Sequence, residues 1–527
     1  MLISNHFSPN KTREAITITP SRDLTVEDFE QVVLKGATVE ISPESLKDVE
    51  ASYDFLCEFA KHKVIYGVNT GFGPMAQYRV EDNCVKDLQY NLIRSHAAGT
   101  GEKIDDRSVK AAMLVRLSAI SKGYSGIHPS TILLLKDMIN KDIIPVIPRH
   151  GGVGASGDLV QLSHLALAMI GEGKVSFKGE IRNTADVFRE EGLKPIEVKT
   201  REGLSLINGT SVMTGIGAIN ALKSRQLLEW CICSSAMMNE IVGAFDDYFS
   251  KELNGVKKHQ GQMYIADEMS RVLRSSKLIA RREEHFYNGN GHQQEKEFDR
   301  KVQEYYSLRC VTQILGPVYE AIENAIRIVE NEVNSVSDNP VIDYKNRNVF
   351  HGGNFHGDYI SLEMDKLKLA VTRMSMLSER QLAFLFNPNL NKLLPPFINF
   401  GTLGLNLGMQ GIQFTATSTT AENQMLSNSM YVHSIPTNND NQDIVSMGTN
   451  SALIAKTVID NAYQVQAIHM LALVQAIDYL QIADKLSDST RHTYKAIRSI
   501  VPVFVEDKPK YEELALICDY IYNNRFE

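Results

Sequence analysis

The feature that most constrains the fold is a long stretch near the carboxyl end that is almost free of charge. Between Ser451 and Leu480 only Lys456, Asp460 and Asp478 carry a full charge. A helix of that length with so few charges cannot face water on one side. Other helices, from this chain or from a partner subunit, must therefore surround it, and we predict a long-helix bundle with a large oligomeric interface.

Helical periodicity dominates the chain after residue 205. The apolar residues that recur at three- and four-residue steps include Val318, Ala321, Ile322, Ala325, Val329, Val333 and Val336. This period predicts a helix, with Pro317 in its first turn and the sequence SDNP at 337–340 as its end. Residues 251–305 are instead dense in charged and amide side chains, which predicts an exposed excursion.

The first part of the chain has a different character, because short segments alternate with glycine-rich turns. We therefore predict a mainly α protein with two regions. Residues 1–205 form a smaller, mixed N-terminal region, and residues 206–527 form the long-helix bundle that supplies the oligomer core.

Charge and composition limit the partners of the protein. The 527 residues include 63 acidic and 55 basic ones, so the net charge is −8 and the pI is near 6.0. Such a chain is not built to coat nucleic acid or an anionic membrane. The first residues lack a basic segment followed by an apolar one, and no apolar run approaches the roughly 18 residues of a membrane span. We expect a soluble, cytoplasmic protein.

The six cysteines form no C-x-x-C motif. The nearest pair, Cys231 and Cys233, would point away from each other on a helix, so we expect no shared metal. This pattern is typical of free thiols in a reducing compartment.

A glycine-rich motif at residues 152–157 follows an apolar run and precedes a helix-like stretch at 159–170. Its sequence, Gly-Val-Gly-Ala-Ser-Gly, matches the G-x-G-x-x-G of dinucleotide-binding loops. However, Pro145 and Pro148 interrupt the would-be strand, and the alternating strands and helices of a doubly wound sheet do not follow. A second interpretation is a glycine turn that caps a helix.

A third interpretation assigns the chemistry to Ala155, Ser156 and Gly157 themselves. If the backbone bends so that the amide nitrogen of Gly157 reaches the carbonyl carbon of Ala155, a five-membered ring can close, and glycine permits the required dihedrals. Loss of water from the ring and from Ser156 then leaves a methylene group conjugated to an imidazolone. The product is an electrophile that ordinary side chains do not supply.

The sequence around this motif resembles the signature of the aromatic amino acid ammonia-lyases, a family of histidine, phenylalanine and tyrosine ammonia-lyases and related aminomutases. The resemblance covers roughly residues 50 to 485. The segments that carry it are GGVGASGDLVQLSHLALAMIGEG (151–173), VIYGVNTGFG (64–73), NLIRSHAAGTG (91–101), LINGTSVMTG (206–215), QEYYSLRC (303–310), GGNFHGD (352–358), TTAENQ (419–424) and NQDIVSMG (441–448). It implies non-oxidative elimination of ammonia from an aromatic amino acid. It also implies that residues 155–157 become 4-methylidene-imidazol-5-one (MIO) autocatalytically, with no metal or nucleotide cofactor.

The resemblance further implies roles for residues outside the motif. Tyr66, in a glycine-rich loop, matches the catalytic base that removes the β-proton; a free phenol has a pKa of about 10, so the site must favour the phenolate. Arg309 matches the arginine whose planar fork binds the substrate carboxylate with two hydrogen bonds. The positions that match residues orienting the substrate, stabilising the MIO group or lining the pocket are Asn208, Gln303, Tyr306, Phe355 and Gln442.

The ring-binding positions are Ser95, His96 and Glu422. The Ser-His pair and the glutamate match histidine lyases, whereas the wider sequence resembles a bacterial tyrosine ammonia-lyase subgroup that keeps all three. His96 could bind a phenol hydroxyl as well as an imidazole, and a site with such a partner should reject phenylalanine. The resemblance therefore implies conversion of L-tyrosine to trans-p-coumarate, with L-histidine to urocanate as the alternative. Phenylalanine and aminomutase chemistry stay open.

Members of the family are homotetramers in which each active site draws on three subunits, so the resemblance implies a homotetramer with shared active sites. Two other classes of function are a nucleotide-binding oxidoreductase that uses residues 152–157 and a helical scaffold without catalysis. The scaffold is disfavoured because it has no need for Tyr66, Ser156, Asn208 and Arg309 together.

Overall fold

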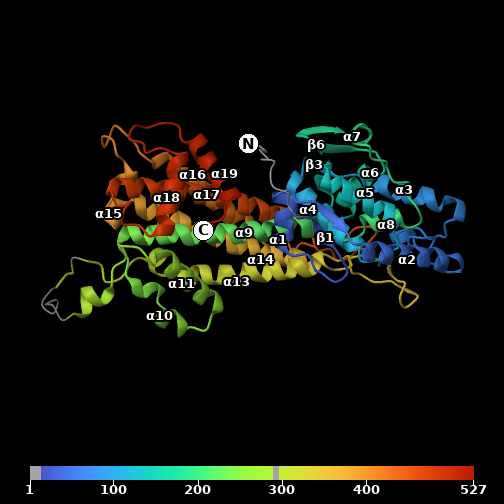
Figure 1. Cartoon of the computed structure of the whole chain (residues 1–527), viewed down its shortest axis with the longest axis horizontal. Coiled ribbons are helices and arrows are strands. Elements are labelled where there is room, and N and C mark those ends of the chain that lie inside the picture. The colour runs from blue at the N-terminus through green and yellow to red at the C-terminus, as the bar shows by residue number, and fades with distance from the viewer. Residues whose placement is uncertain (1–13, 289–295, 299, 527) are drawn as a thin grey trace.

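The computed structural model describes residues 14–288, 296–298 and 300–526. Figure 1 shows an elongated molecule in which the N-terminal elements gather at one end and long helices run from there toward the other. The helices of the elongated part are α9 Ser211–Val242, α10 Lys251–Gly255, α11 Gln260–Leu273, α12 Tyr306–Arg309, α13 Val311–Val333, α14 Asp358–Phe386, α15 Pro388–Asn391, α16 Gln410–Leu426, α17 Gly448–Leu480, α18 Asp488–Ile500 and α19 Tyr511–Asn523. The predicted mainly α bundle is confirmed.

The weakly charged stretch forms helix α17, which packs against α9, α14, α16 and α19 of the same chain. Tyr463, near its middle, is completely buried. The three charges of the stretch are paired, Lys456 with Asp460 at 2.7 Å and Asp478 with Arg498 at 2.7 Å. The prediction that helices surround this segment is therefore confirmed, and helices of its own chain supply the cover.

Helix α13 differs from its prediction at the start. It begins at Val311, so Pro317 lies inside the helix and not in its first turn. Val311 and Leu315 are fully buried and extend the apolar stripe toward the amino end, against α9 and α11. We infer that this packing outweighs the backbone hydrogen bond that a proline inside a helix forgoes.

Helix α11 corrects the expectation of an exposed excursion at 251–305. Ile265, Met269 and Val272 share one face of this helix and are buried, and α11 packs against α13 and α9. The charged residues occupy the other face, so composition alone overstated the exposure. Residues 289–295 and 299 lie outside the described part of this stretch.

The N-terminal end combines short helices with small sheets. Its helices are α1 Val26–Phe29, α2 Pro43–Phe59, α3 Val85–His96, α4 Asp106–Ile120, α5 Pro129–Asn140, α6 Leu159–Met169, α7 Thr184–Glu191 and α8 Glu202–Ile207, and the strands of the chain are β1 Ile16–Ile18, β2 Val39–Ile41, β3 Thr100–Lys103, β4 Ile144–Pro145, β5 Pro148–His150, β6 Lys174–Phe177, β7 Glu180–Asn183, β8 Val341–Asp343 and β9 Asn348–Phe350. Strands β4, β6 and β7 form an antiparallel sheet, β1 and β2 pair in parallel, and β3–β5 and β8–β9 pair antiparallel.

These sheets are too small and too scattered for the doubly wound architecture that a dinucleotide loop would require. The boundary expected between residues 205 and 206 stays a prediction. Across the described residues, no helix combines the length and hydropathy that a membrane crossing demands.

Candidate active site

The glycine-rich motif forms a tight turn between β5 and α6. Gly154 and Gly157 have φ angles of +76° and +69°, in the left-handed region that favours glycine. Two segments distant in sequence hold the turn by backbone hydrogen bonds. The N–H of Met447 donates to the carbonyl of Val153 at 2.9 Å, and the N–H of Gly357 donates to that of Gly154 at 3.2 Å.

The backbone at Gly157 lies directly against Gly209. The N–H of Asp158 donates to the Gly209 carbonyl at 2.8 Å, and a Cβ atom on Gly157 would lie 1.9 Å from that carbonyl oxygen. In the described part of the chain, the Gly157 N–H donates to no acceptor. The amide nitrogen that ring closure needs is therefore free of hydrogen bonds to the residues that the structure describes. It belongs to a position where any residue other than glycine would clash with Gly209. The motif therefore fits an MIO group.

The other residues of the motif and their neighbours also suit ring formation. Ala155, whose carbonyl carbon would join the ring, is buried. The Oγ atom of Ser156 accepts a hydrogen bond from Nε2 of Gln442 at 2.8 Å. Phe355 is half-buried two residues before Gly357, on the loop that contacts the turn. The structure thus brings Gln442 into contact with Ser156 and places Phe355 two residues from the backbone contact of Gly357 with Gly154.

Asp158 follows the motif directly and was missed by the sequence analysis. Its buried carboxylate accepts hydrogen bonds from the N–H groups of Val212 at 2.8 Å and Met213 at 3.0 Å, in the first turn of α9, and from the hydroxyl of Thr449. It therefore fastens the motif to the start of α9. Burial raises the pKa of Asp158 to about 6 despite these bonds. An acidic residue right after a glycine turn was the available signal.

We expect the stability of the protein, relative to an Asp158→Asn variant, to fall as pH rises from 4 to 7. The folded-state pKa of about 6 exceeds the ordinary value of 3.8. The carboxyl therefore contributes fully below pH 3.8, and this contribution is lost as pH rises through 6; the span is about 3 kcal/mol. Urea unfolding of both proteins at several pH values measures the difference, and a difference that is constant or grows with pH contradicts the prediction.

Tyr66 lies in the loop between α2 and α3, which is anchored on a small apolar cluster. Its phenol oxygen accepts a hydrogen bond from the N–H of Gly73 at 3.1 Å. Gln89 of α3 ties this loop to α8, because its Nε2 donates to the carbonyl of Gly67 at 3.0 Å and its Oε1 accepts from the N–H of Leu204 at 3.1 Å. The loop of the predicted base is thereby linked to the helix that ends at Ile207.

Asn208 follows α8 and is 4% exposed. Its Oδ1 accepts a hydrogen bond from the N–H of Asn339 at 3.0 Å, and its backbone carbonyl accepts one from Nη1 of Arg116 at 2.8 Å. Its side-chain nitrogen donates to no acceptor among residues that the structure describes. Gly209, the next residue, pairs with Gly157, so the backbone of Asn208 lies one residue from the motif's contact.

Ser95 and His96 end helix α3. The Nδ1 atom of His96 lies 3.0 Å from the carbonyl oxygen of Leu92 and 3.1 Å from Oγ of Ser95. A carbonyl oxygen can only accept, so Nδ1 carries a hydrogen, and in the neutral ring Nε2 is an acceptor. His96 is half-buried, whereas Ser95 is exposed.

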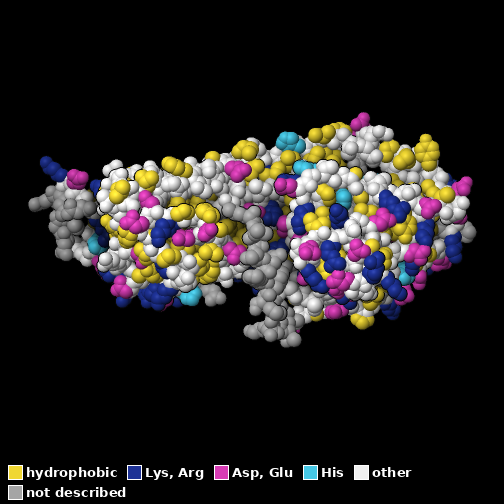
Figure 2. Space-filling model, turned by 90° about the horizontal axis from the view of Figure 1, so that it is seen from above, with side chains coloured by type: hydrophobic (Ala, Val, Ile, Leu, Met, Phe, Trp, Pro, Cys, Tyr) yellow, Lys and Arg dark blue, Asp and Glu magenta, His cyan; other side chains and the backbone are white. Residues whose placement is uncertain are grey.

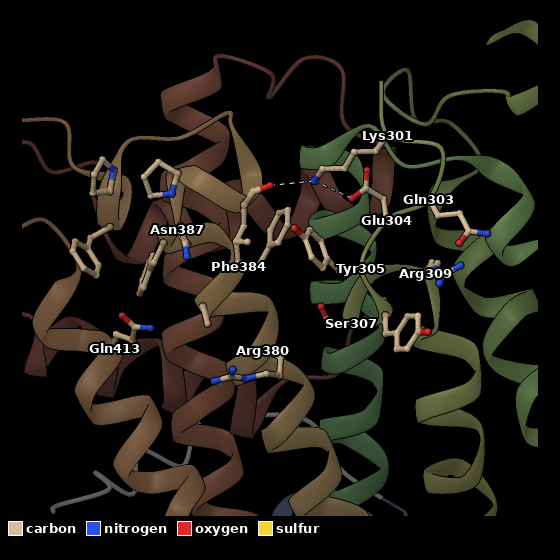
Figure 3. Close-up of a pocket in the computed structure, with 17 residues that line it drawn as sticks. Lys301, Gln303, Glu304, Tyr305, Ser307, Arg309, Arg380, Phe384, Asn387 and Gln413 are labelled. Carbon is tan, nitrogen blue, oxygen red and sulfur yellow. Dashed lines mark hydrogen bonds and ion pairs between the residues drawn. The ribbon is translucent and has the colours of Figure 1, made fainter. Parts of the chain in front are cut away.

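The predicted carboxylate-binding arginine lies elsewhere. Arg309 packs over the ring of Tyr306, with 4.8 Å between its guanidinium carbon and the ring centroid. Its Nε is buried without a hydrogen-bond partner, and within the described residues no carboxylate pairs with it. Both residues and Gln303 line a cavity of about 1220 Å³, and Figure 3 shows Gln303 and Arg309 on the side opposite Asn387.

Helix α9 gives the distance between the motif and Arg309. Asp158 binds its first turn at Val212, whereas Asn239, near its other end, donates to the carbonyl of Leu308 at 3.3 Å. With a rise of about 1.5 Å per residue, residues 212 and 239 are about 40 Å apart. One chain therefore does not bring Arg309 to the motif, although the sequence assigns both to one site.

Glu422 occupies a third place, on α16. Its Oε2 accepts a hydrogen bond from Nδ2 of Asn461 in α17 at 3.0 Å. Asn461 lies about 20 Å along α17 from Met447, which contacts the motif, at about 1.5 Å per residue. Arg380 and Gln413, which also line the cavity at Arg309, were not anticipated from the sequence. No pattern in the sequence marks either of them.

Comparison with known proteins identifies the family of the chain. A family profile described as aromatic amino acid lyase matches residues 24–499. The chain is 39% identical over 511 residues to a tyrosine 2,3-aminomutase of Chondromyces crocatus, covering 96% of each, and 37% identical over 499 residues to a histidine ammonia-lyase of Stigmatella aurantiaca, covering 94% of each. The crystal structure of a tyrosine aminomutase from Streptomyces globisporus superimposes with a TM-score of 0.92 at 34% identity, over 97% of both chains. The chain belongs to the aromatic amino acid lyase family.

Proposed function

We propose that the protein eliminates ammonia from L-tyrosine to give trans-p-coumarate, with an MIO electrophile made from Ala155, Ser156 and Gly157. Membership of this family implies the MIO group. When present, that group supplies the electrophilic carbon that turns the substrate amine into a better leaving group. The observation that carries the proposal is the turn itself, in which Gly157 keeps its N–H free and Ser156 contacts Gln442.

Tyr66 is proposed as the base that removes the β-proton of the substrate. The Gly73 N–H that donates to its oxygen stabilises negative charge on that atom when the proton has left. Because the loop contains Gly67, Gly71 and Gly73, it can close over the substrate and exclude water.

Arg309 is proposed to bind the substrate carboxylate. A partly buried guanidinium without a carboxylate partner among the described residues is suited to an incoming anion, and its planar fork accommodates two parallel hydrogen bonds. Gln303 and Tyr306 line the same cavity and would orient the rest of the substrate.

We further propose a homotetramer whose active sites each combine residues of three chains. What supports this is the division of the predicted site into three places, with Arg309 about 40 Å from the motif along α9. Exposed apolar side chains on the elongated part offer surface for such contacts (Figure 2). They include Leu369 on α14, Phe414 on α16 and Leu403, Leu405 and Leu407 before α16.

The state of His96 favours a substrate whose ring carries a hydrogen-bond donor, as tyrosine does, over phenylalanine. Because Nδ1 donates to the Leu92 carbonyl, the neutral ring offers Nε2 as an acceptor, and a phenol hydroxyl can donate to it. An imidazole N–H can donate as well, so histidine remains the second candidate, supported by the histidine ammonia-lyase relative. A tyrosine 2,3-aminomutase is also a candidate, since a relative 39% identical over 511 residues bears that name.

A substrate panel tests this proposal. Phenylalanine lacks a ring donor and leaves Nε2 of His96 unpaired, so we expect kcat/KM for tyrosine to exceed that for phenylalanine about 10- to 100-fold. Absorbance of p-coumarate, urocanate and cinnamate follows release, and chromatography detects any β-tyrosine. His96→Ala should bring the kcat/KM for tyrosine closer to that for phenylalanine. A preference for histidine would identify a histidine ammonia-lyase, and β-tyrosine as the main product would identify a tyrosine 2,3-aminomutase; either result would overturn the proposal.

A further inference from the structure

Behind Asn208 lies a buried ionic network that the proposed reaction does not use directly. Arg116 of α4 is completely buried and pairs with Asp338, which is 3% exposed, at 2.9 Å. The same guanidinium donates to the backbone carbonyl of Asn208 at 2.8 Å and to that of Ser205. One buried cation thus joins α4, the end of α8 and the turn that precedes β8.

The residue after Asp338 fixes the side chain of Asn208. The N–H of Asn339 donates to Oδ1 of Asn208 at 3.0 Å. A backbone N–H can only donate, so this contact determines which terminal atom of Asn208 is the oxygen. The nitrogen must then point away from Asn339. Oδ1 of Asn339 in turn accepts from the N–H of Gly352 at 2.9 Å, which ties this turn to the loop of Phe355.

We propose that Arg116, Asp338 and Asn339 are positioning residues that aim the side-chain nitrogen of Asn208 at the reacting group beside Gly157. The proposal rests on the proposed function, which supplies the identity of that group. The contact between Gly209 and Gly157 sets how close Asn208 comes, and the network sets how its amide is turned. A donor must be fixed before charge develops in order to stabilise it at no reorganisation cost.

The charge of Asp338 is needed because Arg116 is buried. A buried cation without a counterion is strongly unfavourable, so loss of the carboxylate should displace the guanidinium and the two backbone segments it joins. Both atoms that orient Asn208, its own carbonyl and the Asn339 N–H, belong to those segments. A displacement of about 1 Å is enough to lower a catalytic rate about 100-fold.

Asp338→Asn tests the proposal because it keeps the shape of the side chain and removes its charge. We expect kcat for the amino acid substrate to fall about 10- to 100-fold, with KM within about twofold, because Arg309 binds the carboxylate elsewhere. In an Asn208→Ala background the same change should lower kcat by less than about twofold, because residues that act through one group are not additive.

Two further readouts separate positioning from damage. Intact mass should remain about 36 Da below the sequence mass, which reports two lost waters and a complete MIO group. The near-ultraviolet band of that group should shift in both Asp338→Asn and Asn208→Ala, since the first change would turn and the second would remove the donor that Asn208 would offer to the group. Asp478→Asn breaks a partly buried ion pair at the far end of α17, and should leave kcat and the band unchanged.

The outcomes are distinct. The positioning role is overturned if Asp338→Asn folds and has wild-type kcat. It is also overturned if Asp338→Asn lowers kcat by the same factor with Asn208 present and in the Asn208→Ala background. If Asp338→Asn does not fold, Asp338→Glu, which keeps the charge but moves it by one methylene group, is put through the same cycle and decides in its place. Failure of the proposed function looks different, because wild-type protein would then lack the mass deficit and the near-ultraviolet band.

Discussion

Ser156→Ala should abolish turnover and leave the fold intact. An alanine side chain has no hydroxyl to lose as water, so the conjugated methylene cannot form, and we expect kcat/KM to fall at least about 1000-fold, equivalent to about 4 kcal/mol of barrier. The fold should persist because the Ser156 hydroxyl contributes one hydrogen bond, from Gln442, before the ring forms. Steady-state kinetics, intact mass and near-ultraviolet absorbance measure the three consequences.

Ser163→Ala is the matched control, since Ser163 lies on α6 a few residues after the motif and bonds the carbonyl of Leu159 at 2.6 Å. It should keep the activity, the mass deficit and the near-ultraviolet band. Wild-type activity in Ser156→Ala would rule out the electrophile and with it the proposed function. An open peptide of unchanged mass in active wild-type protein would do the same.

Mixing two inactive variants should restore activity. Arg309→Ala removes the carboxylate contact and should lower kcat/KM at least about 100-fold. Arg309 and the motif are far apart in one chain, so the proposed tetramer would combine them from different chains. In assemblies formed from equal amounts of Ser156→Ala and Arg309→Ala chains, about a quarter of the sites receive both intact residues. Co-expression with two affinity tags, followed by kinetics on the doubly purified protein, measures this fraction.

The control for this mixing experiment combines two variants whose substitutions both lie at the motif. Ser156→Ala and Asn208→Ala affect residues that adjoin each other through the contact of Gly157 with Gly209, so no mixed site would be intact and activity should stay low. No recovery with Arg309→Ala, in assemblies shown to contain both chains, would contradict shared sites. Full activity of a monomer in dilute solution would contradict them as well.

The sequence predicted what local patterns control. The scarcity of charge between residues 451 and 480 identified α17, because burial on all sides is a property of composition and period. The glycines at 154 and 157 marked the turn, because few other residues adopt its dihedrals. The start of α13 was wrong, since proline propensity is a local rule that packing of Val311 and Leu315 overrode.

The arrangement of the site could not be obtained in this way. Arg116 and Asp338 are 222 positions apart and carry no shared motif, so only the fold reveals their contact. Likewise, a motif predicts that Arg309 serves an active site but does not indicate which chain's active site. Distances between distant segments depend on the tertiary structure and on assembly, and neither is encoded in residue spacing.

The length of α9 fixes the distance between the motif and the backbone near Arg309. Its first turn holds the residue after the motif, and its last turns support the backbone before Arg309. Removal of one residue would shorten this rod by about 1.5 Å and rotate one end by about 100° against the other. In the proposed tetramer, the thirty-two positions of α9 would set the spacing between two active sites, and we expect insertions and deletions there to be tolerated far less than in the surface loops.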